Sequence, residues 1–92
     1  MFSYTVLRYA NRDIFKITCE RIEKQYPTVK RARILEDVDG TQIQIYYIND
    51  KKIKIVNDYE VDAVYIDSDI ELAELHFNSS QESFLPITKN SI

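Results

Sequence analysis

The chain of 92 residues contains a single glycine, Gly40, and only two prolines. Glycine is the usual residue where a backbone turns sharply, so its near absence restricts the chain to short, regular connections. Gly40 follows Asp39, and an Asp-Gly pair between two alternating runs is a strong signal for a two-residue hairpin turn. We therefore expect residues 29–38 and 41–48 to form an antiparallel β-hairpin.

The length of each turn decides which residues share a face, because side chains alternate along a strand. In the expected hairpin Val38 lies opposite Thr41. A three-residue turn at 49–51 then places Ile53 and Ile55 of the next strand on the apolar face of the hairpin. A two-residue turn would place Lys52 and Lys54 on that face instead. The apolar face predicted in this way carries Ala32, Ile34, Val38, Ile43, Ile45, Tyr47, Ile53 and Ile55.

Two further strands extend this pattern. A three-residue turn at 57–59 places Lys54 across from Asp62. It also adds Val61, Ala63 and Tyr65 to the same apolar face. At the N-terminus, residues 2–9 alternate in character and predict another strand.

One long helix is predicted after the first strand. Asn11 is a good N-cap, and Asp13 complements the positive end of the helix dipole. Pro27 disfavours helical geometry at Tyr26 and therefore ends the helix. The apolar stripe of the helix consists of Ile14, Phe15, Thr18, Cys19, Ile22 and Tyr26.

These elements predict an α+β fold with a largely antiparallel sheet of four to five strands, in the order β-α-β-β-β-β, and one main amphipathic helix on one face. Ser68 and Glu71 match a capping box, which indicates a short C-terminal helix over 69–77, with a further strand as the alternative. We interpret residues 1–78 as a single domain and 79–92 as a tail that is either docked or flexible.

Charge is distributed unevenly along the chain. Residues 1–54 carry 11 basic and 7 acidic residues, whereas residues 55–92 carry 1 basic and 8 acidic residues. The net charge of −3 conceals this asymmetry. Soluble surfaces normally mix both signs, so a long acidic segment indicates a surface that attracts a partner of opposite charge.

Composition narrows the class of protein. A lone Cys19 cannot form an internal disulfide, which favours a cytoplasmic location. No run approaches the roughly 18 consecutive apolar residues of a membrane span, and the N-terminus lacks the features of a signal peptide, so no membrane partner is expected. Cys19 is predicted to be buried and His76 is the only histidine, so we expect no enzyme, cofactor or metal site.

Two local patterns carry alternative chemistry. The acids of residues 67–71 alternate and would offer oxygen ligands to a divalent cation, but the spacing of an EF-hand loop is missing, so a solvated turn is favoured. Basic residues around Tyr46 would suit single-stranded nucleic acid, although the sequence pI of about 5.1 disfavours this partner. The basic residues in question are Lys30, Arg31, Arg33, Lys52 and Lys54.

The acidic segment is the stronger functional signal. We predict a small acidic inhibitor that neutralises a basic protein partner, such as a nuclease-type toxin or effector, by electrostatic docking, in the manner of an immunity protein or a phage inhibitor. A nucleic-acid-binding module that uses the basic sheet face is the alternative, and a homodimer through an exposed edge strand is a further expectation. The predicted partner-binding residues are Asp58, Tyr59, Glu60, Asp62, Asp67, Asp69, Glu71 and Glu74.

Overall fold

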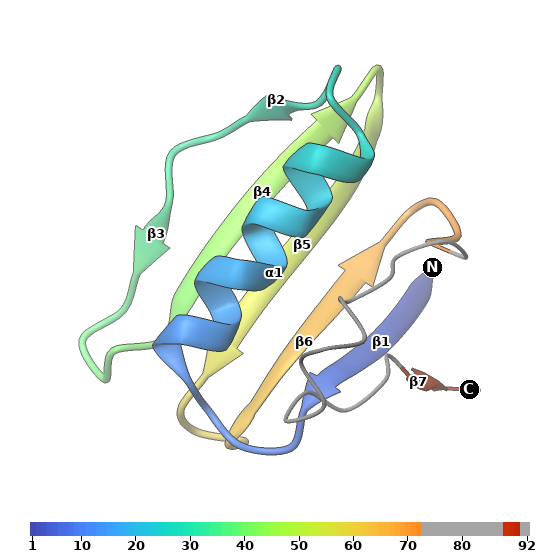
Figure 1. Cartoon of the computed structure of the whole chain (residues 1–92). Helices are drawn as coiled ribbons and strands as arrows, with labels where there is room; N and C mark the ends of the chain where they lie inside the picture. Colours follow the sequence, from blue (N-terminus) through green and yellow to red (C-terminus); the bar gives the residue numbers. More distant parts are fainter. Residues whose placement is uncertain (73–87, 91–92) are drawn as a thin grey trace.

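A computed structural model describes residues 1–72 and 88–90 of the chain. In this part of the chain, one helix crosses one face of an antiparallel sheet (Figure 1). The helix is α1 (Arg12–Gln25), and the strands are β1 (Phe2–Leu7), β2 (Lys30–Arg31), β3 (Leu35–Glu36), β4 (Gln42–Ile48), β5 (Lys51–Asp58), β6 (Ala63–Ser68) and β7 (Thr88–Asn90).

The strands occupy six positions in the sheet, in the order β2, β4, β5, β6, β1 and β7. β3 pairs with β4 as β2 does, so β2 and β3 follow one another along the same edge. This arrangement confirms the predicted α+β class with one main helix. The described residues fill six strand positions rather than four to five, because β7 adds to the outer side of β1.

Helix α1 forms where the sequence predicts it. The Asn11 backbone is extended, and its side-chain oxygen accepts a hydrogen bond from the N–H of Ile14 at 2.9 Å. The last helical residue is Gln25, and Tyr26 is the C-cap that precedes Pro27. The buried side of the helix consists of Ile14, Phe15, Thr18, Cys19 and Ile22.

The turn between β4 and β5 is shorter than predicted. It contains two residues, Asn49 and Asp50, because Ile48 pairs directly with Lys51. Asn49 has a φ of 56°, in the left-handed region that asparagine tolerates better than most residues. Because the turn is one residue shorter, each side chain of β4 lies on the face opposite to the one predicted. Gln44 and Tyr46 share the helix side with Ile53 and Ile55, while Ile43, Ile45 and Tyr47 lie on the far side.

The turn between β5 and β6 is longer than predicted, with four residues at 59–62 instead of three at 57–59. Asp62 ends this turn with a φ of 61°. The change of length places Lys54 opposite Asp67 and not opposite Asp62. The helix side of β6 consequently carries Val64, Ile66 and Ser68 rather than Val61, Ala63 and Tyr65.

The hairpin around Gly40 is confirmed, but its turn has three residues, 38–40, because the N–H of Asp37 donates to the carbonyl of Thr41 at 2.8 Å, next to the pair formed by Glu36 and Gln42. Gly40 has a φ of 92°, a conformation that side chains with a Cβ rarely adopt. Val38, which was expected in the apolar face, is fully exposed at the tip of this turn.

The hydrophobic core lies between α1 and the sheet. Its buried members are Tyr4, Val6, Leu7, Ile14, Phe15, Cys19, Ile22, Tyr46, Ile53, Ile55, Val64, Ile66 and Leu72. One fully buried polar residue, Asn57, joins the start of the helix to the sheet. Its Oδ1 accepts a hydrogen bond from the N–H of Asn11 at 2.8 Å, and its Nδ2 donates to Oε1 of Gln42 at 3.2 Å.

Two predictions concern segments that are only partly described. The short helix predicted over 69–77 is not formed at 69–72, and residues 73–77 lie outside the described part of the chain. The predicted domain boundary at residue 78 lies outside it as well. Within residues 1–72 and 88–90, no helix has the length and hydrophobicity needed to span a bilayer.

Candidate functional site: an acidic end of the sheet

The fold divides the acidic segment into two groups at opposite ends of β6. Residues 58–62 form the turn that precedes the strand, and residues 67–71 lie at its other end (Figure 1). At about 3.3 Å per strand residue, the two groups are roughly 20 Å apart. The predicted binding residues therefore do not form one surface, and Glu74 lies outside the described residues.

The group at the end of β6 lies beside lysines. Asp67 is opposite Lys54 in the sheet, and its Oδ1 accepts a hydrogen bond from the hydroxyl of Ser3 at 2.7 Å. Asp69 pairs with the backbone of Lys52, whose N–H donates to Oδ2 at 2.9 Å. The sequence predicts the least compensated charge at this end of the sheet, and the observed register instead brings basic residues to Asp67 and Asp69.

The group in the turn between β5 and β6 is held by the backbone of the turn itself. Oδ1 of Asp58 accepts hydrogen bonds from the N–H groups of Glu60 at 2.9 Å and Val61 at 3.1 Å. Oδ1 of Asp62 accepts one from the N–H of Ala10 at 2.8 Å, which ties the turn to the loop before α1. These donors are neutral, so they fix the two carboxylates without cancelling their charge.

Tyr65 also contacts Asp58. Its hydroxyl donates to Oδ2 of Asp58 at 3.4 Å. Burial raises the pKa of Tyr65, and the negative charge of Asp58 raises it further. The hydroxyl therefore stays protonated at neutral pH and remains a hydrogen-bond donor to the turn.

The turn around Gly40 lies against the turn at 59–62. The N–H of Tyr59 donates to Oγ1 of Thr41 at 3.1 Å, and the ring of Tyr59 lies beside Gly40. In the Gly40 turn, Oδ1 of Asp39 accepts a hydrogen bond from the N–H of Thr41 at 2.9 Å. This hydrogen bond lowers the pKa of Asp39, which is therefore ionised at neutral pH.

We call the surface formed by these two turns the acidic end. Its carboxylates come from the same two turns as three exposed apolar or aromatic side chains, Val38, Tyr59 and Val61. Arg12 forms an ion pair with Glu36 at 2.7 Å. The acidic end consists of Val38, Asp39, Asp58, Tyr59, Glu60, Val61 and Asp62.

Val38, Asp39 and Val61 were not predicted as site residues. Asp39 and Val38 come from a turn about 20 positions earlier in the sequence, and only the observed pairing of β4 with β5 brings that turn beside Tyr59. The signal that would have found them is the expectation that both turns lie at the same end of an antiparallel meander.

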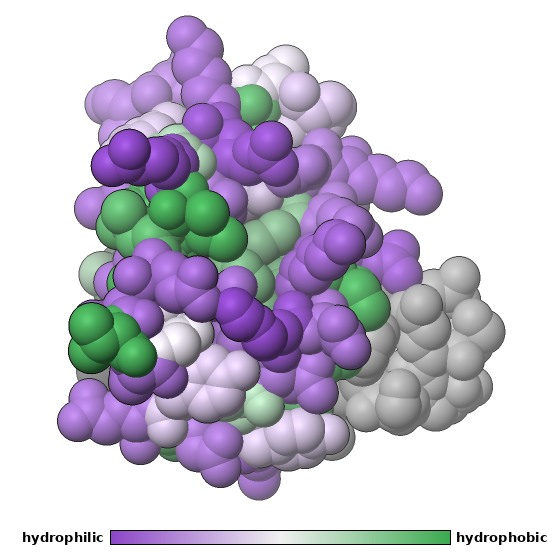
Figure 2. All heavy atoms as spheres, turned by 90° about the vertical axis from the view of Figure 1, so that its left-hand side faces the viewer, coloured by the Kyte–Doolittle hydropathy of each residue, from purple (hydrophilic) through white to green (hydrophobic). Residues whose placement is uncertain are grey.

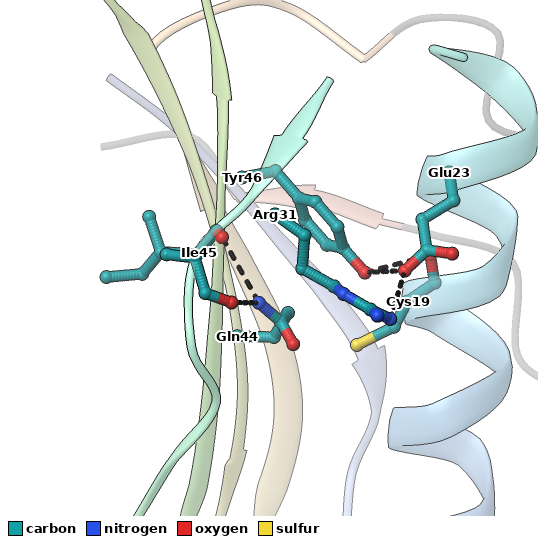
Figure 3. Close-up of polar contacts among 7 residues, drawn as sticks. Cys19, Glu23, Arg31, Gln44, Ile45 and Tyr46 are labelled. Carbon is teal, nitrogen blue, oxygen red and sulfur yellow. Dashed lines mark hydrogen bonds and ion pairs between the residues drawn. The ribbon is translucent and has the colours of Figure 1, made fainter. Parts of the chain in front are cut away.

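The aromatic residue predicted at the centre of the nucleic-acid surface is not available there. Tyr46 is completely buried on the helix side, so it cannot stack on a base. Its hydroxyl donates to Oε2 of Glu23 at 2.5 Å and to the carbonyl of Cys19 at 3.4 Å (Figure 3). Burial, followed by the hydrogen bond to Glu23, raises the pKa of Tyr46. The exposed aromatic of this strand is Tyr47, and it lies between Lys30 and Lys52.

A groove of about 550 Å³ runs between α1 and the edge formed by β2, β3 and β4. Some of its polar groups are paired within the chain: Nη1 of Arg31 donates to Oε2 of Glu23 at 3.3 Å, and Nε2 of Gln44 donates to the carbonyl of Ala32 at 2.6 Å (Figure 3). Burial raises the pKa of the Cys19 thiol beside this groove to about 12. A thiol with that pKa is protonated at neutral pH and is a poor nucleophile.

Metal-binding chemistry is not supported at the acids of residues 67–71. The hydroxyl of Ser68 is used within the chain, donating to the carbonyl of Ile70 at 2.6 Å. Among the residues that the structure describes, no group of three or more His, Cys, Asp or Glu side chains is placed to hold a metal ion.

Comparison with known proteins gives no relative for this chain. No protein-family model matches it, and neither the curated proteins nor the solved structures contain a significant match. Functional inference therefore rests on the surface of the molecule.

Proposed function

We propose that this chain is a small acidic protein-binding inhibitor. Its acidic end docks on a basic partner, such as a nuclease-type toxin or effector, and blocks it in the manner of an immunity protein or a phage inhibitor. The observation that supports the proposal is the combination, in two adjacent turns, of fixed carboxylates and exposed apolar side chains. The proposal includes a cytoplasmic location and gives the chain no catalytic role.

The carboxylates would supply long-range attraction and orientation. A cluster of one sign raises the rate of encounter with a partner of opposite charge. Asp39, Asp58 and Asp62 are already ordered by hydrogen bonds, so they lose less conformational entropy when they bind. Glu60 is exposed at the centre of the same turn.

The apolar groups would supply the short-range affinity. Val38 is fully exposed, Val61 is 63% exposed and Tyr59 is 40% exposed. Apolar and aromatic side chains inside a charged rim are typical of the buried centre of a protein interface. The proposal therefore narrows the predicted binding residues to the acidic end and leaves Asp67, Asp69 and Glu71 outside the docking surface.

The test compares the same charge change at the two ends of β6. Glu60→Lys alters the acidic end, and Glu71→Lys is its matched control, because both residues are exposed glutamates. A basic protein that co-purifies with the tagged chain from its native host would be isolated and titrated against each variant. We expect Glu60→Lys to weaken binding at least tenfold and to reduce its salt dependence, with little effect of Glu71→Lys. Equal affinities for the two variants would contradict the proposal.

A nucleic-acid-binding module is the alternative, and one observation favours it. Lys30, Tyr47 and Lys52 lie in one row across three strands, which places an exposed aromatic ring between two cations. Such a row suits single-stranded nucleic acid. Fluorescence anisotropy with a labelled single-stranded oligonucleotide at low salt tests this alternative, and Tyr47→Ala should abolish any binding that depends on the row.

The homodimer predicted from the sequence would need a free strand edge. The first strand does not provide one, because β1 pairs with β6 on one side and with β7 on the other. The described sheet has two outer edges, one at β7 and one formed by β2 and β3.

A further inference from the structure

The β2–β3 edge forms one outer side of the sheet (Figure 1). Within the described part of the chain, β2 and β3 pair with β4 on their inner side and with no strand on their outer side. An edge of this kind presents backbone N–H and C=O groups to another strand.

Backbone direction identifies the groups that point outward. The N–H of Ala32 donates to the carbonyl of Ile45 at 2.9 Å, and the N–H of Asp37 donates to the carbonyl of Thr41 at 2.8 Å. Both therefore point inward. Successive residues of an antiparallel strand alternate in direction, so Arg31 in β2 and Glu36 in β3 direct their N–H and C=O groups away from β4. They point the same way although they are five positions apart, because the pairing with β4 shifts by one residue between β2 and β3.

The charges along the edge are ordered by sign. Residues 30–37 read KRARILED, with three basic residues in the first half and two acidic residues in the second. An antiparallel pair of identical segments places the first half of one copy opposite the second half of the other. Opposite charges then face each other twice, whereas a parallel pair would bring like charges together.

One register satisfies charge and backbone direction together. With the two-fold axis between Arg33 and Ile34, Arg31 lies opposite Glu36 of the second copy, and the outward backbone groups of these two residues meet. The side chains of Arg31 and Glu36 also lie on the same face of the sheet, because their partners in β4, Tyr46 and Gln42, lie on the same side of that strand.

The centre of this edge is apolar. Ile34 and Leu35 are each 47% exposed, next to the position of the two-fold axis. Figure 2, which faces this side of the molecule, shows hydrophobic groups between hydrophilic ones. In this register Ile34 lies opposite Arg33 of the second copy and Leu35 lies opposite its Ala32, so pairing would cover both apolar side chains. Burial and charge therefore favour the same arrangement.

We propose that the β2–β3 edge is a self-association surface, on which a second copy of this chain pairs antiparallel with Arg31 opposite Glu36. Within one chain, Arg31 also contacts Glu23 at 3.3 Å, and Glu36 contacts Arg12 at 2.7 Å. These contacts are exposed and leave further donor positions on both guanidinium groups. The dimer extends each ion pair into a network of four charges.

The test uses charge reversal and mixing. Arg31→Glu gives an edge with two acidic residues at the pairing positions, and Glu36→Arg gives an edge with two basic ones. We expect the weight-average mass of the unmodified chain in sedimentation velocity to rise with concentration from 10.9 kDa toward twice that value. Each variant alone should stay at 10.9 kDa up to millimolar concentration, and an equimolar mixture should again rise toward the dimer.

Mixing distinguishes contacts between chains from contacts within a chain. Each variant lacks one internal ion pair, and mixing does not restore it, so a dimer in the mixture can come only from contacts between the two chains. Circular dichroism melting of both variants checks that they are folded. Hydrogen exchange of the unmodified chain adds a measurement without substitution: the amides of Arg31 and Glu36 should exchange more slowly as concentration rises. An unmodified chain that stays monomeric at millimolar concentration would overturn the proposal, and so would a mixture that behaves like its separate components.

Discussion

Asp58 has two functions in this account, and two substitutions separate them. Its Oδ1 holds the N–H groups of Glu60 and Val61, at 2.9 Å and 3.1 Å, and its charge contributes to the acidic end. Asp58→Ala removes both the acceptor and the charge. Asp58→Asn removes the charge but keeps an acceptor oxygen of the same reach.

The size of the stability change follows from the two hydrogen bonds. A side-chain oxygen that caps exposed backbone N–H groups contributes about 0.5–2 kcal/mol. For a domain of 60–100 residues, 1 kcal/mol corresponds to about 4–8 °C in Tm. We therefore expect Asp58→Ala to lower Tm by about 2–16 °C and Asp58→Asn to lower it by less.

The assay is thermal unfolding by circular dichroism at neutral pH, together with partner affinity for each variant. Both variants should bind a basic partner more weakly than the unmodified chain, and only Asp58→Ala should lose substantial stability. If the two variants unfold at the same temperature, the hydrogen bonds of Asp58 do not stabilise the turn. If Asp58→Asn binds as tightly as the unmodified chain, the charge of Asp58 does not contribute to docking.

The remaining predictions concern three buried residues, Cys19, Tyr46 and Asn57. The pKa of about 12 leaves on the order of 10⁻⁴ of Cys19 as thiolate at pH 8, so a thiol reagent should modify the folded chain on the order of 10³-fold more slowly than the unfolded chain. Folding raises the pKa of Tyr46, so the stabilisation that comes from its neutral hydroxyl is fully present below about pH 10 and is lost as the pH rises further. Tyr46→Phe should reduce this loss of stability at alkaline pH, measured as Tm at a series of pH values. Tyr46→Phe should also cost about 1 kcal/mol at neutral pH, since it removes the hydrogen bond to the partly exposed Glu23. Asn57→Ala should cost about 2–3 kcal/mol in urea unfolding, because the N–H of Asn11 loses its acceptor.

The helix could be predicted because its signals are local. Asn11 accepts the hydrogen bond expected of an N-cap, and the chain leaves helical geometry before Pro27. The approximate positions of β4, β5 and β6 also followed from alternation, whereas the strand predicted over 29–38 is divided into β2 and β3. These features depend on residues close together in the sequence, so no knowledge of the tertiary arrangement was needed.

The faces of β4 were predicted wrongly, because its apolar alternation lies on the far side of the sheet, whereas its helix side carries the buried polar residue Gln44 beside Tyr46. Ile43 and Ile45 are half-buried on one side, while Tyr46 is fully buried on the other. Turn length was therefore the deciding variable, and it depends on particular conformations. The left-handed φ values of Asn49 and Asp62 allow turns of two and four residues where three were expected in each case.

The candidate site was predicted in part for the same reason. Asp58, Tyr59, Glu60 and Asp62 form one turn, so their proximity followed from the sequence alone. Asp39 joins them only through the pairing of distant strands, and β6 separates Asp67 from them. The acidic segment is thus continuous along the sequence, but the fold divides it between the two ends of β6.

The central claim is that the acidic end, and not the other end of β6, receives a basic partner. An amide-resolved NMR titration of the unmodified chain with a short lysine-rich peptide at low salt tests it directly. We expect the amide signals of residues 38–39 and 58–62 to shift first and added salt to reverse these shifts. Shifts that begin at residues 67–71, or that spread evenly over all acidic residues, would contradict it.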